Sequence, residues 1–269
     1  MTTRDRYNRQ TILPEVGEVG QVRLRNTSAL LVGAGGLGCP ASLYLIAAGL
    51  GRLVIVDPDR VERSNLQRQV GYTDADVGLP KAACLALRLM ALNPESDVQA
   101  VTERFDERNA SSLLSDIDVV IDGTDNFISH FLIGDAAWRA CKPLFTASVH
   151  RFQGQYAAFI PGQGPCHRCL FGEPPPTHRA PNCADAGVLG VLPGIIGVLQ
   201  ATQVLKFILG LGASDMNQLT MYNALQGGFR TVRMTQDPNC PLCAPHASCQ
   251  CPSHPQNKTG ILFSEGYSS

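Results

Sequence analysis

The sequence lacks any surplus of positive charge. Twenty-two Lys and Arg residues face 23 Asp and Glu residues, and the formal net charge is −1. A chain of this balance has no basic field to attract nucleic acid or an anionic membrane surface. We therefore expect no nucleic acid partner. Any polyanion that the chain binds must meet a local cluster of Lys and Arg side chains.

An apolar leader is also missing. Residues Met1 to Tyr7 contain no apolar core of the kind that marks a secretory signal. The most apolar stretch, Ala186 to Leu211, could just reach membrane-spanning length. Pro193 and the polar Gln200 interrupt it, which favours a buried loop and a core helix over a membrane span. We expect a cytoplasmic protein with no membrane partner.

The composition is that of an ordinary globular chain. Hydrophobic residues make up 44% of the 269 residues and charged residues 17%. This length fits one α/β domain or two small ones. In a cytoplasmic chain, the ten cysteines are expected to be metal ligands, nucleophiles or buried small side chains rather than disulfides.

Short apolar runs alternate with helical patterns in the first half of the chain. Strands are predicted at residues 28–33, 52–57, 99–105, 117–122 and 143–148, and helices at 36–48, 80–92 and 126–140. This alternation predicts an α/β fold with a doubly wound parallel sheet.

The pattern changes in the second half of the chain. Strands predicted at 155–160, 219–222 and 228–234 surround one long apolar helix at 194–209, which suits an antiparallel continuation of the same sheet. We predict a single domain over residues 1–251, with a nucleotide-binding half at about 1–150 and a second half at about 151–245. The tail at 252–269 is expected to be disordered.

A glycine loop follows the first predicted strand. Gly33, Gly35 and Gly38 fit the pattern G-x-G-x-x-G, with Gly36 between them, and a predicted helix comes next. Glycines permit a tight turn and close approach of the backbone to phosphate, and a helix N-terminus attracts anions. Asp57, at the end of the next strand, could accept hydrogen bonds from ribose. Taken alone, this pattern indicates an adenine nucleotide site and favours NAD as the ligand. A glycine turn without a ligand and a capping role for Asp57 remain alternatives.

The chain also carries polar and cationic residues that a dehydrogenase does not need. Arg9 precedes the first strand and Lys81 opens a later helix. The segment after the second strand reads Ser64, Asn65, Leu66, Gln67, Arg68 and Gln69. Several cations suit a triphosphate, whose charge must be neutralised before a second anion can approach. Each could instead be a solvated surface charge.

Asp125 and Asn126 follow the strand at 117–122. The carboxyl ends of parallel strands form the ligand crevice of such sheets. Asp125 is therefore placed to hold Mg²⁺ against phosphates. Asn126 could bind nearby or cap the helix that follows.

Taken together and in order, these motifs resemble the HesA/MoeB/ThiF family, the bacterial relatives of ubiquitin-activating enzymes. The motifs are RYNRQ at residues 6–10, GAGGLG at 33–38, SNLQRQ at 64–69, DGTDN at 122–126 and two CxxC pairs, and the resemblance covers about residues 4–245. It implies a Rossmann-like sheet and an ATP- and Mg²⁺-dependent adenylyltransferase. It also implies a homodimer whose partner is a ubiquitin-like β-grasp sulfur-carrier protein ending in Gly-Gly.

The resemblance also implies roles for individual residues. Asp57 matches the ribose ligand and Asp125 the metal ligand. Arg9 matches a residue that reaches the nucleotide of the partner subunit. Asn65, Arg68 and Lys81 match phosphate contacts, and Gly36 matches a glycine whose backbone meets the nucleotide. We predict as catalytic residues Arg9, Arg68, Lys81, Asp125 and Cys183. We predict as nucleotide-binding residues Gly33, Gly35, Gly36, Gly38, Asp57, Ser64, Asn65, Leu66, Gln67, Arg68, Lys81, Asp125 and Asn126.

The chemistry agrees with this implication. A C-terminal carboxylate has a pKa of about 3.5 and is already an anion at neutral pH, so its attack on phosphate needs no general base. Cations and positioning carry such a reaction. The lack of an obvious Ser–His–Asp set is therefore expected.

Two CxxC pairs, Cys166 with Cys169 and Cys240 with Cys243, suit tetrahedral Zn²⁺. A local rival would combine Cys240 and Cys243 with Cys249 and Cys251. The family pattern uses the two distant pairs, which would join the C-terminal segment to the sheet. His167 is expected to be a bystander.

Cys183 matches a loop cysteine to which the family assigns a covalent role in acyl or persulfide transfer. A thiolate is a good nucleophile for an acyl-adenylate, although an external persulfide could attack instead. Cys39, Cys84 and Cys141 are expected in helices as buried small side chains.

Two functional alternatives stay open: a non-catalytic relative that only binds the carrier, and an NAD-dependent oxidoreductase. The pathway is also open, among thiamine, molybdopterin, tRNA thiolation and natural products. Since 18 residues follow Cys251, we expect a separate protein to donate the persulfide sulfur.

Overall fold

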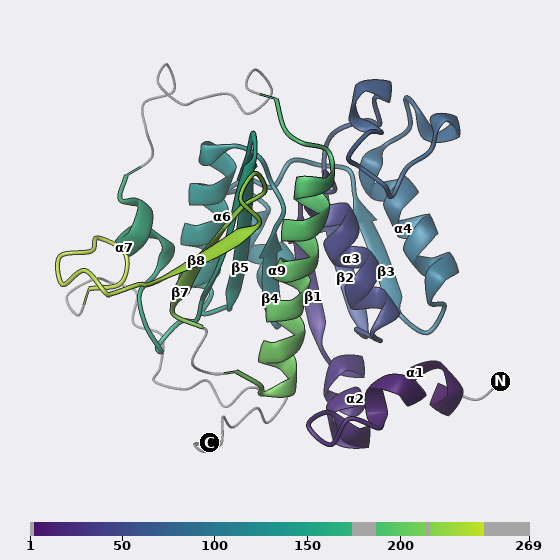
Figure 1. The fold of residues 1–269 in the computed structure, drawn as a ribbon, viewed down its shortest axis with the longest axis horizontal. Helices are drawn as coiled ribbons and strands as arrows, with labels where there is room; N and C mark the ends of the chain where they lie inside the picture. Colours follow the sequence, from purple (N-terminus) through teal and green to yellow (C-terminus); the bar gives the residue numbers. More distant parts are fainter. Residues whose placement is uncertain (1–2, 174–186, 213–215, 245–269) are drawn as a thin grey trace.

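A computed structural model describes residues 3–173, 187–212 and 216–244, which form one mixed eight-stranded sheet with helices on both faces (Figure 1). The strand order is β3-β2-β1-β4-β5-β6-β7-β8. The predicted α/β fold, a doubly wound parallel sheet continued by antiparallel strands, is confirmed.

The first five strands are parallel neighbours. They are β1 (Ser28–Val32), β2 (Arg52–Val56), β3 (Asp97–Val101), β4 (Val119–Asp122) and β5 (Leu144–His150). The last four residues of both β1 and β2 are buried, as expected for strands covered on two faces.

The start and end of β3 differ from the prediction of 99–105. The pairing of Arg52 with Asp97 and of Leu53 with Val98 sets its register. Val98 is the buried residue of this edge strand, and the residues around it are exposed or half-buried. An edge strand offers a weak alternating pattern, which made its position hard to predict.

The last three strands are antiparallel: β6 (Gln153–Phe159), β7 (Gln218–Asn223) and β8 (Gly228–Arg233). All residues of β7 are half-buried, and all residues of β8 are exposed. Burial therefore falls steadily towards this end of the sheet.

Two sets of helices cover the two faces. The first face carries α3 (Gly38–Ala47), α4 (Lys81–Leu92) and α9 (Val191–Leu209), packed on a core that includes Leu31, Ile55 and Phe145. The second face carries α5 (Ala110–Leu114), α6 (Phe127–Arg139) and α7 (His167–Phe171), over a core with Leu30 and Phe159. Figure 1 shows α9 in front of the sheet and α6 behind it.

The remaining elements precede or interrupt this pattern. Helices α1 (Thr3–Thr11) and α2 (Gly17–Arg25), which were not predicted, lie below β1 in Figure 1, at the end where this strand begins. Two short 3₁₀ turns, η1 (Arg63–Asn65) and η2 (Asp74–Asp76), lie between β2 and α4.

Helix α9 is the long apolar helix that the sequence predicts. By length and composition alone it could cross a membrane, a test that core helices of soluble proteins also pass. Here Ile196, Val204 and Phe207 are buried against the sheet and α3. The amide of Gln200 donates to the carbonyl oxygens of Asp122 at 2.8 Å and Phe145 at 2.9 Å. These contacts place α9 in the core.

Candidate functional site

The glycine loop is packed tightly between the ends of β1 and β4. Gly33 has a φ of +95°, and a Cβ on it would lie 2.8 Å from the backbone of Gly123. A Cβ on Gly38 would lie 1.9 Å from the carbonyl oxygen of Gly33. Any side chain at these positions would displace backbone, so the turn requires glycine. The predicted strand, glycine loop and helix are in place.

Asp57 fixes this loop to the end of β2. Its Oδ2 accepts a hydrogen bond from the backbone N–H of Ala34 at 2.7 Å, and its Oδ1 accepts one from Asp59 at 2.8 Å. The side chain is 5% exposed, and burial raises the pKa of its carboxyl group while the two backbone donors oppose the rise. Tyr72 donates to the carbonyl oxygen of Ala34 at 2.7 Å. The loop is thus held in place by the chain itself.

Two predicted cations lie beside the loop. Lys81 is buried, and its Nζ lies 3.1 Å from Oδ2 of Asp59. Arg68 donates from Nη1 to the carbonyl oxygen of Ser64 at 3.4 Å. Its Cγ would lie 3.5 Å from a Cβ on Gly36, so the side chain passes over the loop.

The other residues of the SNLQRQ segment differ in what they contact. The side-chain amide of Asn65 donates to Oγ of Ser64 at 3.0 Å, and Leu66 packs against the core. Gln67 lies against Gly190, just before α9. Gln69 is buried, and its Oε1 has no hydrogen-bond partner in the described chain.

Arg9 lies far from this group within one subunit. Helix α1 is attached at the opposite edge of the sheet, where Gln10 donates to the carbonyl oxygen of Ala48 and Asn93 donates to Tyr7. In Figure 1, α1, which carries Arg9, lies at the end where β1 begins, whereas the glycine loop follows the other end of β1, so Arg9 and the loop of its own chain are not brought together.

Asp125 and Asn126 follow β4 at the carboxyl edge. Asp125 is exposed and lines a cavity. Asn126 is the N-cap of α6: its Oδ1 accepts from the backbone N–H of Ser129 at 2.9 Å. Of the two alternatives for Asn126, the capping role is the one present.

A part-buried pair of His130 and Asp122 lies next to Asp125. Nδ1 of His130 is 2.5 Å from Oδ2 of Asp122, and Thr124 donates to Oδ1 through its backbone N–H at 3.1 Å and its hydroxyl at 2.7 Å. This pair was not predicted from the sequence. An Asp ending a buried strand and a His eight residues later on a helix were its only signal.

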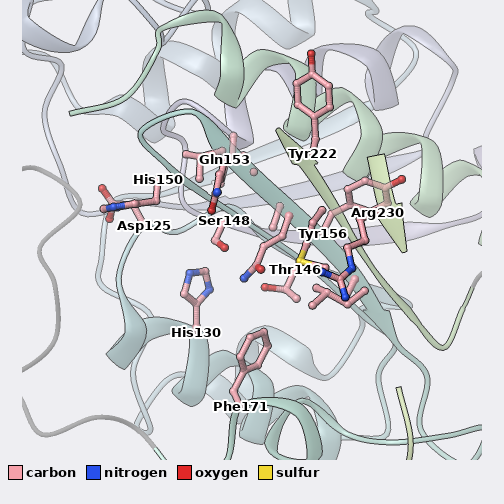
Figure 2. Close-up of a pocket in the computed structure, with 18 of the residues that line it drawn as sticks. Asp125, His130, Thr146, Ser148, His150, Gln153, Tyr156, Phe171, Tyr222 and Arg230 are labelled. Atoms are coloured by element: carbon pink, nitrogen blue, oxygen red, sulfur yellow. The ribbon is translucent and has the colours of Figure 1, made fainter. Parts of the chain in front are cut away.

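The cavity of about 660 Å³ lies between the antiparallel strands and helices α6 and α7 (Figure 2). The sheet contributes Thr146, Ser148, Gln155, Met221 and Arg230, and the helices and the loop before α6 contribute Asp125, His130, Phe131, His167 and Phe171. Asp125 thus borders both the cavity and the carboxyl edge. Leu37 of the glycine loop also lines the cavity, so an extended chain segment entering it would approach this loop.

Four cysteines gather on the second half of the sheet. The Sγ atoms of Cys166, Cys169, Cys240 and Cys243 all lie within 4.8 Å of one another. The Cys166–Cys240, Cys169–Cys243 and Cys166–Cys169 distances between Sγ atoms are 3.4, 3.3 and 3.9 Å. Tetrahedral zinc with Zn–S bonds of about 2.3 Å sets such distances at about 3.8 Å. The backbone N–H of Asp237 also donates to Cys169 Sγ at 3.4 Å. This donor set fits zinc.

The other described cysteines divide into two groups. Cys39 is fully buried, and burial raises the pKa of its thiol to about 12, as expected for a packing residue; Cys84 is half-buried on α4. Cys141 follows the end of α6 with a φ of 54° and is disulfide-bonded. For Cys141 the expectation of a buried small side chain without a disulfide was wrong, because this residue is half-buried and disulfide-bonded, and it lies after the end of α6 at Arg139. Cys183, Cys249, Cys251 and the tail 252–269 lie outside the described residues.

Comparison with known proteins gives one consistent result. The model of the ThiF family matches residues 7–242. The sulfur carrier protein adenylyltransferase of Thermus thermophilus is 48% identical over 244 residues, covering 89% of this chain and 90% of that protein. The SAMP-activating enzyme E1 of Haloferax volcanii is 46% identical over 242 residues, covering 90% and 89%.

Longer relatives and solved structures agree. The adenylyltransferase and sulfurtransferase MOCS3 of Drosophila ananassae is 42% identical over 240 residues, but this chain spans only 53% of it. The crystal structure of E. coli MccB with ATP superposes with a TM-score of 0.76 at 22% identity, over 89% of this chain and 74% of that chain. At that identity the likeness concerns the fold.

Proposed function

The chain belongs to the ThiF family, and we propose that it is an ATP-dependent adenylyltransferase acting on the C-terminal carboxylate of a ubiquitin-like sulfur-carrier protein. The observation that carries the proposal is the meeting of two features at Asp125. On one side lies the carboxyl edge of the sheet with its glycine loop, Arg68 and Lys81; on the other lies the cavity.

In this proposal ATP lies at the glycine loop. The backbone of Gly36 approaches the nucleotide closely, and Arg68 and Lys81 lie beside the phosphates. Asp57 would accept a ribose hydroxyl while keeping its bonds to Ala34 and Asp59, since a carboxylate offers about four acceptor positions. Asp125 would bind Mg²⁺, which supplies positive charge against the phosphate oxygens.

The carrier would bind over the antiparallel half of the sheet. Its extended Gly-Gly tail fits a cavity whose far end is bordered by Asp125, and glycines need little width. Residues of β7 and β8 line the cavity, and the half-buried side chains of β7 and the exposed ones of β8 would be accessible to a folded partner.

The reaction follows from this placement. A carboxylate oxygen of the carrier attacks the α-phosphorus of ATP, a new C–O–P link forms, and the bond from that phosphorus to the pyrophosphate oxygen breaks. No proton is transferred in this step, because the carboxylate is already ionised. Arg68 and Lys81 offset the charge on the phosphates, so that two anions can come together.

Zinc in the four-cysteine cluster would have a structural role. It would join α7 to the segment that follows β8, and α7 forms one wall of the cavity. The local rival site with Cys249 and Cys251 is less favoured, because Cys240 and Cys243 already lie with Cys166 and Cys169.

Further parts of the proposal concern assembly, sulfur transfer and location. A homodimer would bring Arg9 of one subunit to the nucleotide of the other. Cys183 would take part only after adenylation, so Cys183→Ala should leave pyrophosphate release unchanged. A separate protein would donate the persulfide sulfur, and we propose the cytoplasm as the location.

An NAD-dependent oxidoreductase is the weaker alternative. It accounts for the glycine loop and Asp57, but not for Lys81 and Arg68 beside the loop or for the carrier-enzyme relatives. A non-catalytic carrier-binding relative accounts for the cavity but leaves these cations without a role.

ATP–pyrophosphate exchange tests the proposal. The purified protein is mixed with ATP, Mg²⁺ and each Gly-Gly-ended β-grasp protein of its own source. Exchange with one carrier supports the activity and identifies the pathway. ATP binding without exchange for any carrier contradicts catalysis and favours the binding-only alternative; NADH binding without ATP binding favours the oxidoreductase.

A further inference from the structure

A histidine at the cavity wall has no role in the function proposed so far. His130 lies on α6, one turn after Asp125, and its side chain is 17% exposed. Figure 2 shows its ring standing in the cavity, on the opposite side from Arg230 and below Ser148 in this view.

The partners of His130 fix which atom faces the cavity. Nδ1 is bonded to the carboxylate of Asp122 at 2.5 Å, so the ring is oriented by a fully buried group. Nε2 has no hydrogen-bond partner among the described residues, although the ring lines the cavity. A carboxylate that accepts from Nδ1–H fixes a histidine ring and makes its other nitrogen available.

Asp122 is held by more than His130. It also accepts from the hydroxyls of Thr124 at 2.7 Å and Thr146 at 3.3 Å. A buried carboxylate with this many donors stays ionised, and the pKa of Asp122 is lowered because His130 and Thr124 outweigh the effect of burial. Asp122 therefore offers a fixed negative charge behind the ring.

That charge acts on His130. Burial alone lowers the pKa of the imidazole, but the charge of Asp122 and its hydrogen bond raise it by more, so the pKa lies above its usual value; Asp125 adds to the rise. Other groups that face the cavity are His150, Arg230 and His167. Burial lowers the pKa of His167 to about 4, so this ring is neutral.

We propose that Nε2 of His130 binds the C-terminal carboxylate of the carrier, with Asp122 as the residue that positions the ring. The proposal rests on the function proposed above. A carboxylate entering the cavity next to Asp125 meets a like charge and needs a cationic donor at the same point. His130, one helical turn from Asp125 and open to the cavity, provides that donor.

The test compares two forms of the carrier, one with a free C-terminal carboxylate and one with a C-terminal carboxamide. Binding to the full-length protein is measured by calorimetry without ATP. A hydrogen bond to a charged group contributes about 1.5–3 kcal/mol, so we expect the wild type to bind the carboxylate form about 10- to 100-fold more tightly.

The main variant is His130→Asn. Asparagine can still reach Asp122 in place of Nδ1, but it has no atom in place of Nε2. We expect it to bind both forms equally, with a carrier KM raised about 10-fold or more and an ATP KM unchanged within about 2-fold. Asp122→Asn, which keeps the shape but removes the charge, should reduce the preference for the carboxylate in part. His150→Gln, at an exposed position of the same cavity, is the matched control and should behave as wild type.

Each outcome decides the question. If folded His130→Asn, checked by its unfolding temperature, retains the wild-type preference, the assignment is overturned. Equal binding of the two forms by the wild type also overturns it but leaves the adenylyltransferase function standing. If the wild type binds neither form of any carrier, the proposed function itself fails.

Discussion

The carboxyl edge of the sheet around the glycine loop, called the glycine edge below, and the four-cysteine cluster are held together in different ways. At the glycine edge, Asp57, Tyr72 and the contact of Gly33 with Gly38 and Gly123 hold the backbone in place through the chain alone. At the cysteine cluster, four thiols converge from segments 74 residues apart, with a metal as the expected link. The first region is preorganised by the chain itself, whereas we expect the structure of the second to depend on a bound metal.

The largest effect expected from this comparison is a loss of adenylation activity, caused by a substitution at the glycine edge. Asp125→Ala removes an exposed carboxylate that makes no bond within the core, so we expect adenylation to fall about 100-fold or more with an unchanged unfolding temperature. Pyrophosphate release and thermal unfolding check the two parts. Near-normal release would remove Asp125 from the metal site.

At the cysteine cluster, a substitution should lower the unfolding temperature. Cys166→Ser is expected to lose bound zinc and lower Tm by about 10 °C, because metal binding and folding are linked at such sites. Metal analysis and calorimetry measure both. Cys84→Ser, at a half-buried free thiol on α4, is the control and should keep its zinc. A Cys166→Ser protein with full zinc would point to the local C-terminal site.

A smaller effect tests whether the glycine edge is held by packing. Gly33→Ala and Gly78→Ala place a side chain at similar positive φ values, +95° and +87°, but only the first meets backbone. We expect unfolding free energies lower by about 3 and about 1 kcal/mol, because strain is common to both and the clash is not. Urea unfolding measures the difference. Equal losses would mean that the close contact of the three glycines adds nothing.

The smallest effect concerns pH. The pKa of His130 is raised in the folded state, so its contribution to stability is fully present below about pH 6.5 and is lost as pH rises through the folded pKa. The stability advantage of wild type over His130→Gln should therefore shrink as pH rises above about 6.5. Asp122, with a lowered pKa, does not titrate in this range. A constant difference in urea unfolding would show that the pair is not ionic.

The sequence predicted those parts of the site that depend on local geometry. The glycine loop, Arg68 beside it and the two CxxC pairs are read from spacing, since backbone turns and metal ligands impose fixed intervals. Lys81 was also predicted, but its bond to Asp59 was not. The roles of the individual nucleotide-binding and catalytic residues stay predictions.

What the sequence could not predict depends on contacts between distant segments. The hydrogen bond of Tyr72 to Ala34, 38 residues apart, is set by how the loop after β2 folds back on β1. The pairing of His130 with Asp122 needs α6 to begin just after β4, so that its first turns pass over the strand end.

The exposed edge of β8 has a consequence for how the isolated protein behaves in solution. An edge strand offers unpaired N–H and C=O groups to any other strand, including the same strand of another molecule. Arg230 and Arg233 project on opposite faces of β8, so two such edges brought together would repel each other on both faces. Salt screens that repulsion but does not weaken apolar contacts. Phe229, which is 57% exposed, could then pack against another molecule. High ionic strength, often chosen to keep proteins dispersed, should here favour aggregation.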